Sequence, residues 1–264
     1  MVTHFPFFGS QPAGQGPVLA IAHRGGTLRH PENTLNAFQD AVDLGYRYVE
    51  TDVHASADGQ LYAFHDDDLD RVAGIPGAIG DLDSSELDGL RFDGYRLPRF
   101  DEVLSTWPTV HVNVDPKSDS AVVPLTRALR RHAAIDRVCV GSFSDRRIAW
   151  CRRELGPELC TSMGPREVVR LWLRSRGLPT APFETPCAQV PRRNELPGPL
   201  ALDFDARFVE TAHELGIDVH VWTLNDADAI NEAVDIGVDG IMTDRPDVLR
   251  SVLIERGRWG ASHV

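Results

Sequence analysis

Three carboxylates stand near the ends of two short β-branched runs. Glu50 and Asp52 lie two residues apart in YVETDVH, and Asp115 ends VHVNVD. Side chains two apart on a strand point to the same face, so Glu50 and Asp52 project to one side. Buried neighbouring carboxylates repel each other and are costly to desolvate without a counter-ion. Oxygen ligands suit Mg²⁺ or Ca²⁺, whereas Zn²⁺ prefers His or Cys. The pattern therefore predicts one divalent cation at these strand ends.

Basic side chains accompany these acids. His23 and Arg24 follow the first β-branched run, His65 follows LYAF, and Lys117 comes two residues after Asp115. Imidazole titrates near pH 6.5, so two histidines can supply one acid and one base near neutrality. Arginine and lysine can stabilise negative charge that develops on a substrate. Together these residues predict acid–base chemistry on an anionic substrate.

Each of these residues also has a structural interpretation. His23 alone is compatible with a strand-end histidine whose hydrogen bonds are satisfied. Glu50 and Asp52 are compatible with rim charges paired with Arg47 or another base. Lysine is usually exposed, as expected for Lys117, and the acidic residues at 66–70 are typical of a solvated loop. Their joint placement after consecutive strands favours the chemical interpretation.

The elements that must position these residues alternate along the chain. Helical patterns separate most of the β-branched runs, and several of these patterns end in glycine, the usual residue after a helix. The expected strands are at 17–23, 47–54, 109–115, 137–143, 158–163, 187–191, 217–224 and 237–244. The expected helices are at 33–45, 121–133, 144–156, 164–177, 205–216 and 226–237. Eight strands alternating with helices predict an α/β fold, a single (β/α)₈ TIM barrel, with active residues at the carboxyl ends of its strands.

Three segments depart from the alternation. LYAFHDD at 61–67 follows a turn and is expected to double back on the second strand. The Gly- and Asp-rich stretch at 71–104 has no long periodic element, which predicts a small insertion, at about 68–99, capping one mouth of the barrel. A second long loop spans 192–204. Long loops in compact domains are often functional, so the loops at 71–99 and 192–204 are expected to determine which substrate is bound. We expect residues 1–16 to be an N-terminal extension and 17–264 to be the barrel.

Composition narrows the classes of partner. The 264 residues carry a formal net charge of −12, which disfavours binding to nucleic acid or to an anionic membrane surface. No apolar run reaches the roughly 20 residues that span a bilayer, so no stable membrane insertion is expected. The N-terminus lacks the pattern of a secretory signal, so a cytoplasmic location is expected by default. The four cysteines form no metal-binding spacing and are expected to be reduced, buried thiols. The oligomeric state is left open.

Several runs resemble the glycerophosphodiester phosphodiesterase family. HRGGTLRHPENTLNAF (23–38) resembles its opening signature, and YVETDVHASADGQLYAFHDDDLDR (48–71) its second block, with paired acids and an HD dipeptide. RLPRFDEVL, GSF, VHVWTLND and GVDGIMTDRPD are similar to its later blocks. The resemblance extends from about residue 18 to 250. It implies a barrel with a small insertion after the second strand.

The resemblance also implies roles for individual residues. Glu50 and Asp52 fall on metal-ligand positions, and His23 and His65 fall on the acid–base pair. The resemblance places Arg24 in contact with phosphate and Lys117 as the basic residue of the third strand. The third metal ligand is expected at Asp115, where the family usually has a glutamate. Asp is one methylene shorter, so it either ligates the cation directly after a small shift or does so through water.

Two further residues are expected beside the substrate. Trp222 near the end of a late strand is expected to form one wall of the pocket, with a packing role as the alternative. Glu32 either orients a catalytic group or lies in a motif whose role is structural, since Asn33 or Thr34 can cap the following helix.

The implied reaction is hydrolysis of a small-molecule glycerophosphodiester to glycerol 3-phosphate and an alcohol. The attacking oxygen is either the glycerol 2-hydroxyl, which gives a cyclic phosphate first, or water. Two alternatives are a related barrel phospholipase acting on lysophospholipid or sphingomyelin, and a barrel that binds phosphodiesters without turnover. A phospholipase would need an apolar rim for the acyl chain. The insertion offers no clear rim of this kind, because many acids lie among its apolar residues.

Overall fold

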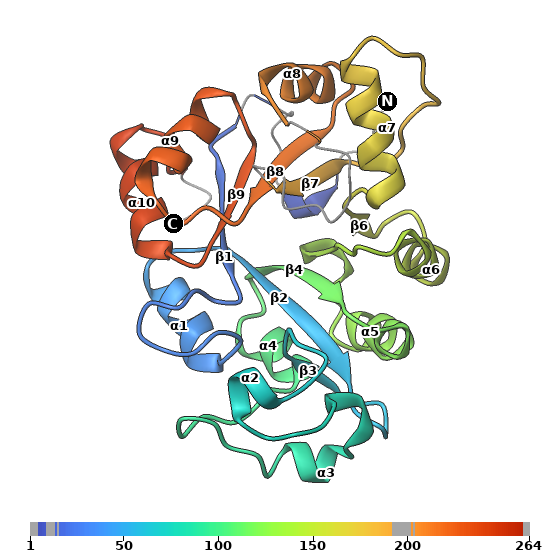
Figure 1. Ribbon diagram of the computed structural model, residues 1–264, viewed down its shortest axis with the longest axis vertical. Helices are drawn as coiled ribbons and strands as arrows, with labels where there is room; N and C mark the ends of the chain where they lie inside the picture. Colours follow the sequence, from blue (N-terminus) through green and yellow to red (C-terminus); the bar gives the residue numbers. More distant parts are fainter. Residues whose placement is uncertain (1–4, 9–13, 15, 192–201, 203, 261–264) are drawn as a thin grey trace.

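A computed structural model describes residues 5–8, 14, 16–191, 202 and 204–260. Within them the strands of Figure 1 belong to one sheet, in which eight follow the order β6-β5-β4-β2-β1-β9-β8-β7. Their pairings along this path are parallel, and a parallel bridge between Ser162 and Cys187 joins the two end strands. The predicted (β/α)₈ barrel is therefore confirmed. Its strands are β1 (Leu19–His23), β2 (Tyr48–Ala55), β4 (His111–Pro116), β5 (Val138–Val140), β6 (Cys160–Thr161), β7 (Cys187–Pro191), β8 (Asp218–Trp222) and β9 (Gly240–Thr243).

The helices lie around the barrel because one face of each is apolar. In α5 the buried positions Ala121, Val122, Leu125, Ala128 and Leu129 recur at the spacing of one helical face. A helix forms at each of the six predicted patterns, although α5 begins two residues before its pattern: α1 (Leu35–Asp43), α5 (Asp119–Arg131), α6 (Asp145–Leu155), α7 (Pro165–Ser175), α8 (Ala206–Glu214) and α9 (Ala227–Asp235). Two longer helices, α4 (Phe100–Thr106) and α10 (Pro246–Glu255), and two four-residue helices within residues 70–87 were not predicted. Among the described residues, no helix has the length and apolarity to cross a membrane.

The amino end of the barrel interior is filled by apolar side chains. Phe7, in the short 3₁₀ helix η1 (Pro6–Phe8), and Phe5, just before it, are buried there with residues of β1, β2 and β9. Three thiols of β5, β6 and β7, those of Cys139, Cys160 and Cys187, pack in the same cluster. The four cysteines are buried free thiols, as the sequence predicts. Packing at this end leaves the opposite mouth for the polar residues.

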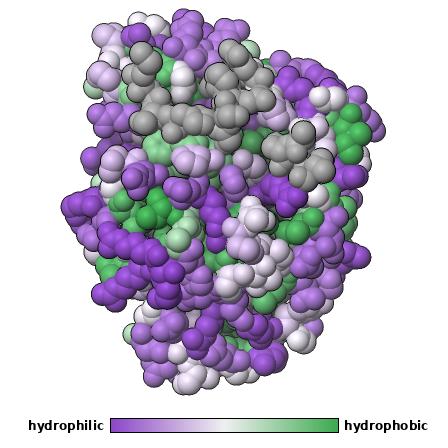
Figure 2. Space-filling view, turned by 180° about the vertical axis from the view of Figure 1, so that it is seen from behind, coloured by the Kyte–Doolittle hydropathy of each residue, from purple (hydrophilic) through white to green (hydrophobic). Residues whose placement is uncertain are grey.

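A short strand doubles back after β2, as predicted. β3 (Leu61–Ala63) pairs antiparallel with β2, and Val53 lies opposite Ala63. The chain then forms α2 (Asp70–Ala73), η2 (Ile79–Asp81) and α3 (Ser84–Leu87) before α4. This segment has an apolar cluster of its own, with Tyr62, Leu69, Ile79, Leu87, Phe92 and Leu97 at its centre. It lies at one end of the molecule in Figure 1, and the corresponding end of the face in Figure 2 is mostly hydrophilic.

Candidate active site

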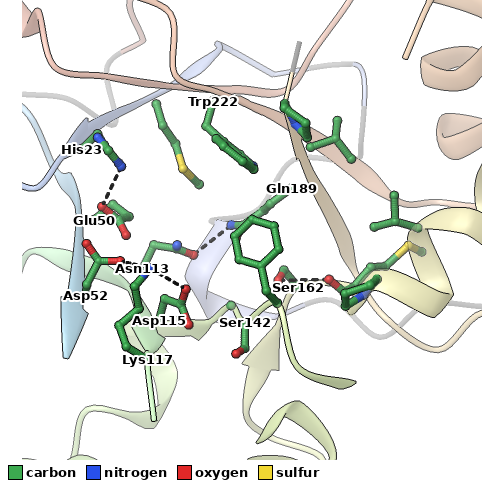
Figure 3. A pocket seen from close by; sticks show the side chains of 18 of the residues that line it. His23, Glu50, Asp52, Asn113, Asp115, Lys117, Ser142, Ser162, Gln189 and Trp222 are labelled. Carbon is green, nitrogen blue, oxygen red and sulfur yellow. Dashed lines mark hydrogen bonds and ion pairs between the residues drawn. The ribbon is translucent and has the colours of Figure 1, made fainter. Parts of the chain in front are cut away.

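One cavity gathers the predicted reactive residues at the carboxyl ends of the strands. It measures about 590 Å³, and Figure 3 shows many of the side chains that line it. Strand register explains the convergence, because His23 lies opposite Glu50 and Asp52 opposite Asp115. All the predicted site residues except Glu32 line this cavity: His23, Arg24, Glu50, Asp52, His65, Asp115, Lys117 and Trp222.

The carboxylates are paired with two buried cations. Lys117 Nζ lies 2.9 Å from Asp52 Oδ1 and 3.2 Å from Asp115 Oδ2. Arg24 Nε lies 3.1 Å from Asp52 Oδ2, and the Arg24 backbone N–H donates to Glu50 Oε2 at 3.2 Å. The expectation that Lys117 is exposed is wrong, since its side chain is only 19% exposed. The two cations that pair with the acids are thus Arg24 and Lys117, and both line the cavity.

Burial acts to raise the pKa of all three acids, and the neighbouring cations reverse this effect only at Asp52. It raises the pKa of Glu50 to about 7, and the neighbouring Asp52 carboxylate adds to the effect. Burial also raises the pKa of Asp115. At Asp52 burial acts in the same direction, but Lys117 and Arg24 outweigh it and lower the pKa. Two of the three acids thus resist ionisation without further positive charge, as expected where carboxylates share a site.

The donor set suits a hard divalent cation, although the side chains do not form a coordination shell. Asp115 Oδ1 is buried and accepts no hydrogen bond, and neither does the buried Asp52 Oδ2, whose contact with Arg24 Nε is an ion pair. Oxygen lone pairs therefore remain inside the cavity. Among the described residues, however, no three His, Cys, Asp or Glu side chains are arranged to hold a metal ion. Lys117 contacts both Asp52 and Asp115. Gathering the three acids around one ion would therefore require the ammonium of Lys117 to shift.

The His23 ring is held by a carboxylate that the sequence analysis did not identify. His23 Nδ1 lies 2.7 Å from Asp244 Oδ1, and Asn225 Nδ2 donates to Asp244 Oδ2 at 2.9 Å. His23 Nε2 lies 3.7 Å from Glu50 Oε2. Burial lowers the pKa of His23, but Glu50 and the Asp244 hydrogen bond outweigh it and raise the value. The Thr243-Asp244 pair, at the carboxyl end of β9, was the available signal for Asp244.

His65 has a matching partner beside it in sequence. His65 Nδ1 lies 2.6 Å from Asp66 Oδ1, and Arg71 Nη2 donates to the same oxygen at 3.1 Å. The interpretation of Asp66 as part of a solvated loop is wrong, because its side chain is only 18% exposed and contacts both neighbours. Both histidines thus have a carboxylate at Nδ1.

Glu32 links the two halves of this arrangement. Its Oε1 accepts from Arg24 Nη1 at 3.0 Å and from Arg71 Nη2 at 2.6 Å. Thr34 is the cap of α1, where its Oγ1 accepts from the Ala37 N–H at 3.1 Å. Asn33 does not cap but accepts from Thr51 Oγ1 at 2.8 Å. The contacts therefore support both alternatives for the Glu-Asn-Thr motif, an orienting role for Glu32 and a structural role for Thr34.

The remaining side of the cavity is uncharged. Trp222 lines it with Phe143, whose ring packs edge-on against the indole at 5.7 Å between centroids. Below them Gln189 Nε2 donates to Asn113 Oδ1 at 2.8 Å, across the barrel interior. Of the loops expected to select the head group, residues 71–99 contribute nothing to the lining and Leu202 contributes one side chain. Residues 192–201 and 203 lie outside the described residues.

Comparison with known proteins agrees with the sequence and the geometry. Residues 23–248 match the model of the "Glycerophosphoryl diester phosphodiesterase family". A protein of Mycobacterium tuberculosis named "Probable glycerophosphodiester phosphodiesterase 2" is 37% identical over 252 residues, covering 92% of this chain and 94% of that protein.

Solved structures share the fold. A glycerophosphodiester phosphodiesterase from Agrobacterium tumefaciens has a TM-score of 0.71 at 26% identity, over 89% of this chain and 100% of that one. A phosphodiesterase from Oleispira antarctica, solved with the product sn-glycerol-3-phosphate, has a TM-score of 0.73 at 23% identity, over 90% of this chain and 97% of that one. The chain therefore belongs to the glycerophosphoryl diester phosphodiesterase family.

Proposed function

We propose that this chain hydrolyses glycerophosphodiesters to glycerol 3-phosphate and an alcohol, with His23 and His65 as acid and base. The observation that supports this most is the meeting of two carboxylate-held imidazoles and three acids in one cavity. The name of the Mycobacterium tuberculosis relative supports the same substrate class.

In the proposed reaction one imidazole removes a proton from the attacking oxygen as that oxygen forms a bond to phosphorus. The other imidazole protonates the alkoxide that departs when the second P–O bond breaks. If the attacking oxygen is that of water, glycerol 3-phosphate forms directly. If it is the glycerol 2-hydroxyl, a cyclic phosphate forms first, and water opens this ring in a second step to give glycerol 3-phosphate. Arg24 and Lys117 supply positive charge where negative charge accumulates on the phosphoryl oxygens.

A divalent cation, Mg²⁺ or Ca²⁺, is part of the proposal. Glu50, Asp52 and Asp115 would hold it, since their oxygens are the ligands that such ions prefer. When bound, it would polarise a phosphoryl oxygen and offset the charge of the three acids. Glu32 would position Arg24, and Trp222 would form a wall beside the substrate.

The first test is hydrolysis of glycerophosphoethanolamine, followed through released glycerol 3-phosphate. His23→Ala and His65→Ala should each lower kcat by about 10²–10⁴-fold, because each removes one proton-transfer group. His213→Ala is the matched control, since His213 contacts Asp239 away from the cavity. Unchanged turnover in both site variants would contradict the assigned roles.

The cation is tested separately by chelation. Excess chelator should abolish turnover, and Mg²⁺ or Ca²⁺ should restore it. Calorimetric titration of chelated protein with each ion should show one site, which Asp52→Asn weakens. Full activity in excess chelator, together with no measurable binding, would remove the cation from the proposal.

A further inference from the structure

The cavity is divided by charge along the order of the strands. Each charged side chain in its lining comes from β1, β2 or β4 or from the segments that follow β1, β3 and β4. The loops after β5 and β6, the start of α7, and β7, β8 and β9 contribute only uncharged residues to the lining. In Figure 3 the labelled acids and His23 lie on one side of the cavity, across from Gln189 and Ser162. Only one half of the site therefore has charged side chains that can bind a glycerophosphate group.

The other half is largely apolar. Aliphatic and aromatic side chains from consecutive elements meet there, namely those of Phe143, Met163, Pro165, Val168, Val169, Pro191 and Trp222. No acidic side chain of the described residues lines this half. We refer to these seven residues as the apolar wall.

The apolar wall extends to the surface. Phe143 is 60% exposed and Val169 is 38% exposed, and both are among the five large apolar residues that are exposed in the described chain. Trp222 and Phe143 contact each other. One cavity is therefore lined both by the three acids and by two apolar residues that are exposed to solvent. Cavities of roughly 300–1,000 Å³ hold drug-sized ligands, so one of about 590 Å³ has room for more than glycerophosphate.

We propose that the apolar wall binds an alkyl or acyl chain of the substrate, so that the preferred substrates are glycerophosphodiesters that carry such a chain. This inference rests on the proposed hydrolysis of glycerophosphodiesters and names the substrate class of the same site. The chain is either the leaving alcohol itself or an acyl group on the glycerol, and both place apolar atoms beside a phosphate held by Arg24 and Lys117. The uncharged lining favours this over a cationic head group.

The test compares kcat/KM across two substrate series, each kept below its critical micelle concentration. One series has alkyl chains of increasing length on the leaving alcohol, and the other has acyl chains of increasing length on the glycerol. In at least one series kcat/KM should rise with length, by at most about fourfold per methylene buried, relative to glycerophosphoethanolamine. The series that rises identifies where the chain is attached. No rise in either series would overturn the inference.

Variants of the wall provide the second arm. Phe143→Ser and Val169→Ser should each lower, by at least tenfold, the ratio of kcat/KM for the preferred long-chain substrate to kcat/KM for glycerophosphoethanolamine. Leu178→Ser and Ile254→Ser are matched controls, because both residues are exposed and lie outside the cavity lining. Equal losses on both kinds of substrate would overturn the inference. A loss confined to glycerophosphocholine would also overturn it and show that the aromatic pair binds a quaternary ammonium.

A binding measurement tests the apolar wall independently of the proposed hydrolysis. Calorimetry should show that octyl phosphate binds at least tenfold more tightly than ethyl phosphate, and that Phe143→Ser removes most of the difference. If no substrate is hydrolysed but this difference is found, the proposed function fails and the apolar wall stands. Equal affinity for the two phosphates would overturn the apolar wall whether or not hydrolysis is found.

Discussion

At the scale of single residues, both imidazoles contact a carboxylate through Nδ1, so Nε2 is the nitrogen available for proton transfer. His23 and Asp244 are 221 positions apart in sequence, so no local pattern pairs them. The resemblance indicated which histidines matter, because His23 and His65 lie in short motifs. It could not indicate what holds each ring, since that depends on the two ends of the chain meeting at the β1–β9 pairing.

Asp244 should act on turnover through His23. Asp244→Asn keeps the shape of the side chain but offers His23 Nδ1 either an amide donor or a neutral acceptor, which weakens the preference for one tautomer. In serine proteases the comparable change lowers kcat by about 10⁴-fold. We expect kcat to fall at least tenfold with little change in KM.

The control for Asp244 is Asp247→Asn, three residues away. Asp247 pairs with Arg245 and does not line the cavity. Steady-state kinetics on both variants, with circular dichroism to verify folding, makes the comparison. Parent-like kcat in Asp244→Asn would show that the contact with His23 has no catalytic role.

At the scale of elements, the strands were easier to predict than two of the helices. Each run of β-branched residues overlaps its strand, with β2 and β4 each ending one residue beyond the predicted run, because buried parallel strands require nearly continuous apolar sequence. α4 was missed because its start lies in the Gly- and Asp-rich stretch at 71–104, which has no long periodic element. α10 follows the last strand and opens on proline, a residue favoured in a first helical turn.

The contribution of the α1 cap to the stability of the protein can be measured. Thr34→Ala removes the acceptor for the Ala37 N–H and the donor to the Pro31 carbonyl, which lies 2.8 Å from Thr34 Oγ1. We expect the free energy of unfolding to fall by about 0.5–2 kcal/mol in urea denaturation. Thr34→Ser is the control, since it keeps the hydroxyl. Equal losses in both variants would assign the effect to the methyl group rather than to the cap.

At the scale of the whole molecule, the alternation of strands and helices predicted the fold, but it could not predict the division of the site. The acids and bases were visible as motifs, whereas the apolar wall comes from separate residues of two loops, of α7, and of the ends of β7 and β8. Of these residues the sequence analysis singled out only Trp222 as a pocket wall. The net charge of −12 likewise says nothing of Arg24 and Lys117, which are local to the cavity.

The boundaries of the predicted units remain proposals. We propose residues 1–16 as an extension and 17–264 as the barrel, with the insertion at about 68–99. Phe5 and Phe7 support close association of the extension with the barrel, because both are buried at its amino end.

A carboxyl group at the amino end of the barrel, that of Asp218, should also make the stability of the protein depend on pH. Asp218 lies there near Asp239, and burial, followed by repulsion from Asp239, raises the pKa of Asp218 to about 8. A carboxyl group that is easier to protonate in the folded state binds more protons there than in the unfolded chain. Its contribution is therefore complete below the unfolded pKa near 4 and is lost as pH rises through about 8.

We expect the free energy of unfolding to fall between about pH 4 and pH 8, with a slope from this group of at most about 1.4 kcal/mol per pH unit. Asp218→Asn mimics the protonated carboxyl at every pH, so it should flatten this slope and stabilise the protein most near pH 8. Urea denaturation at intervals across this range measures the effect, with the exposed Asp136→Asn as control. The same slope in Asp218→Asn as in the parent would show that Asp218 ionises normally in the folded protein.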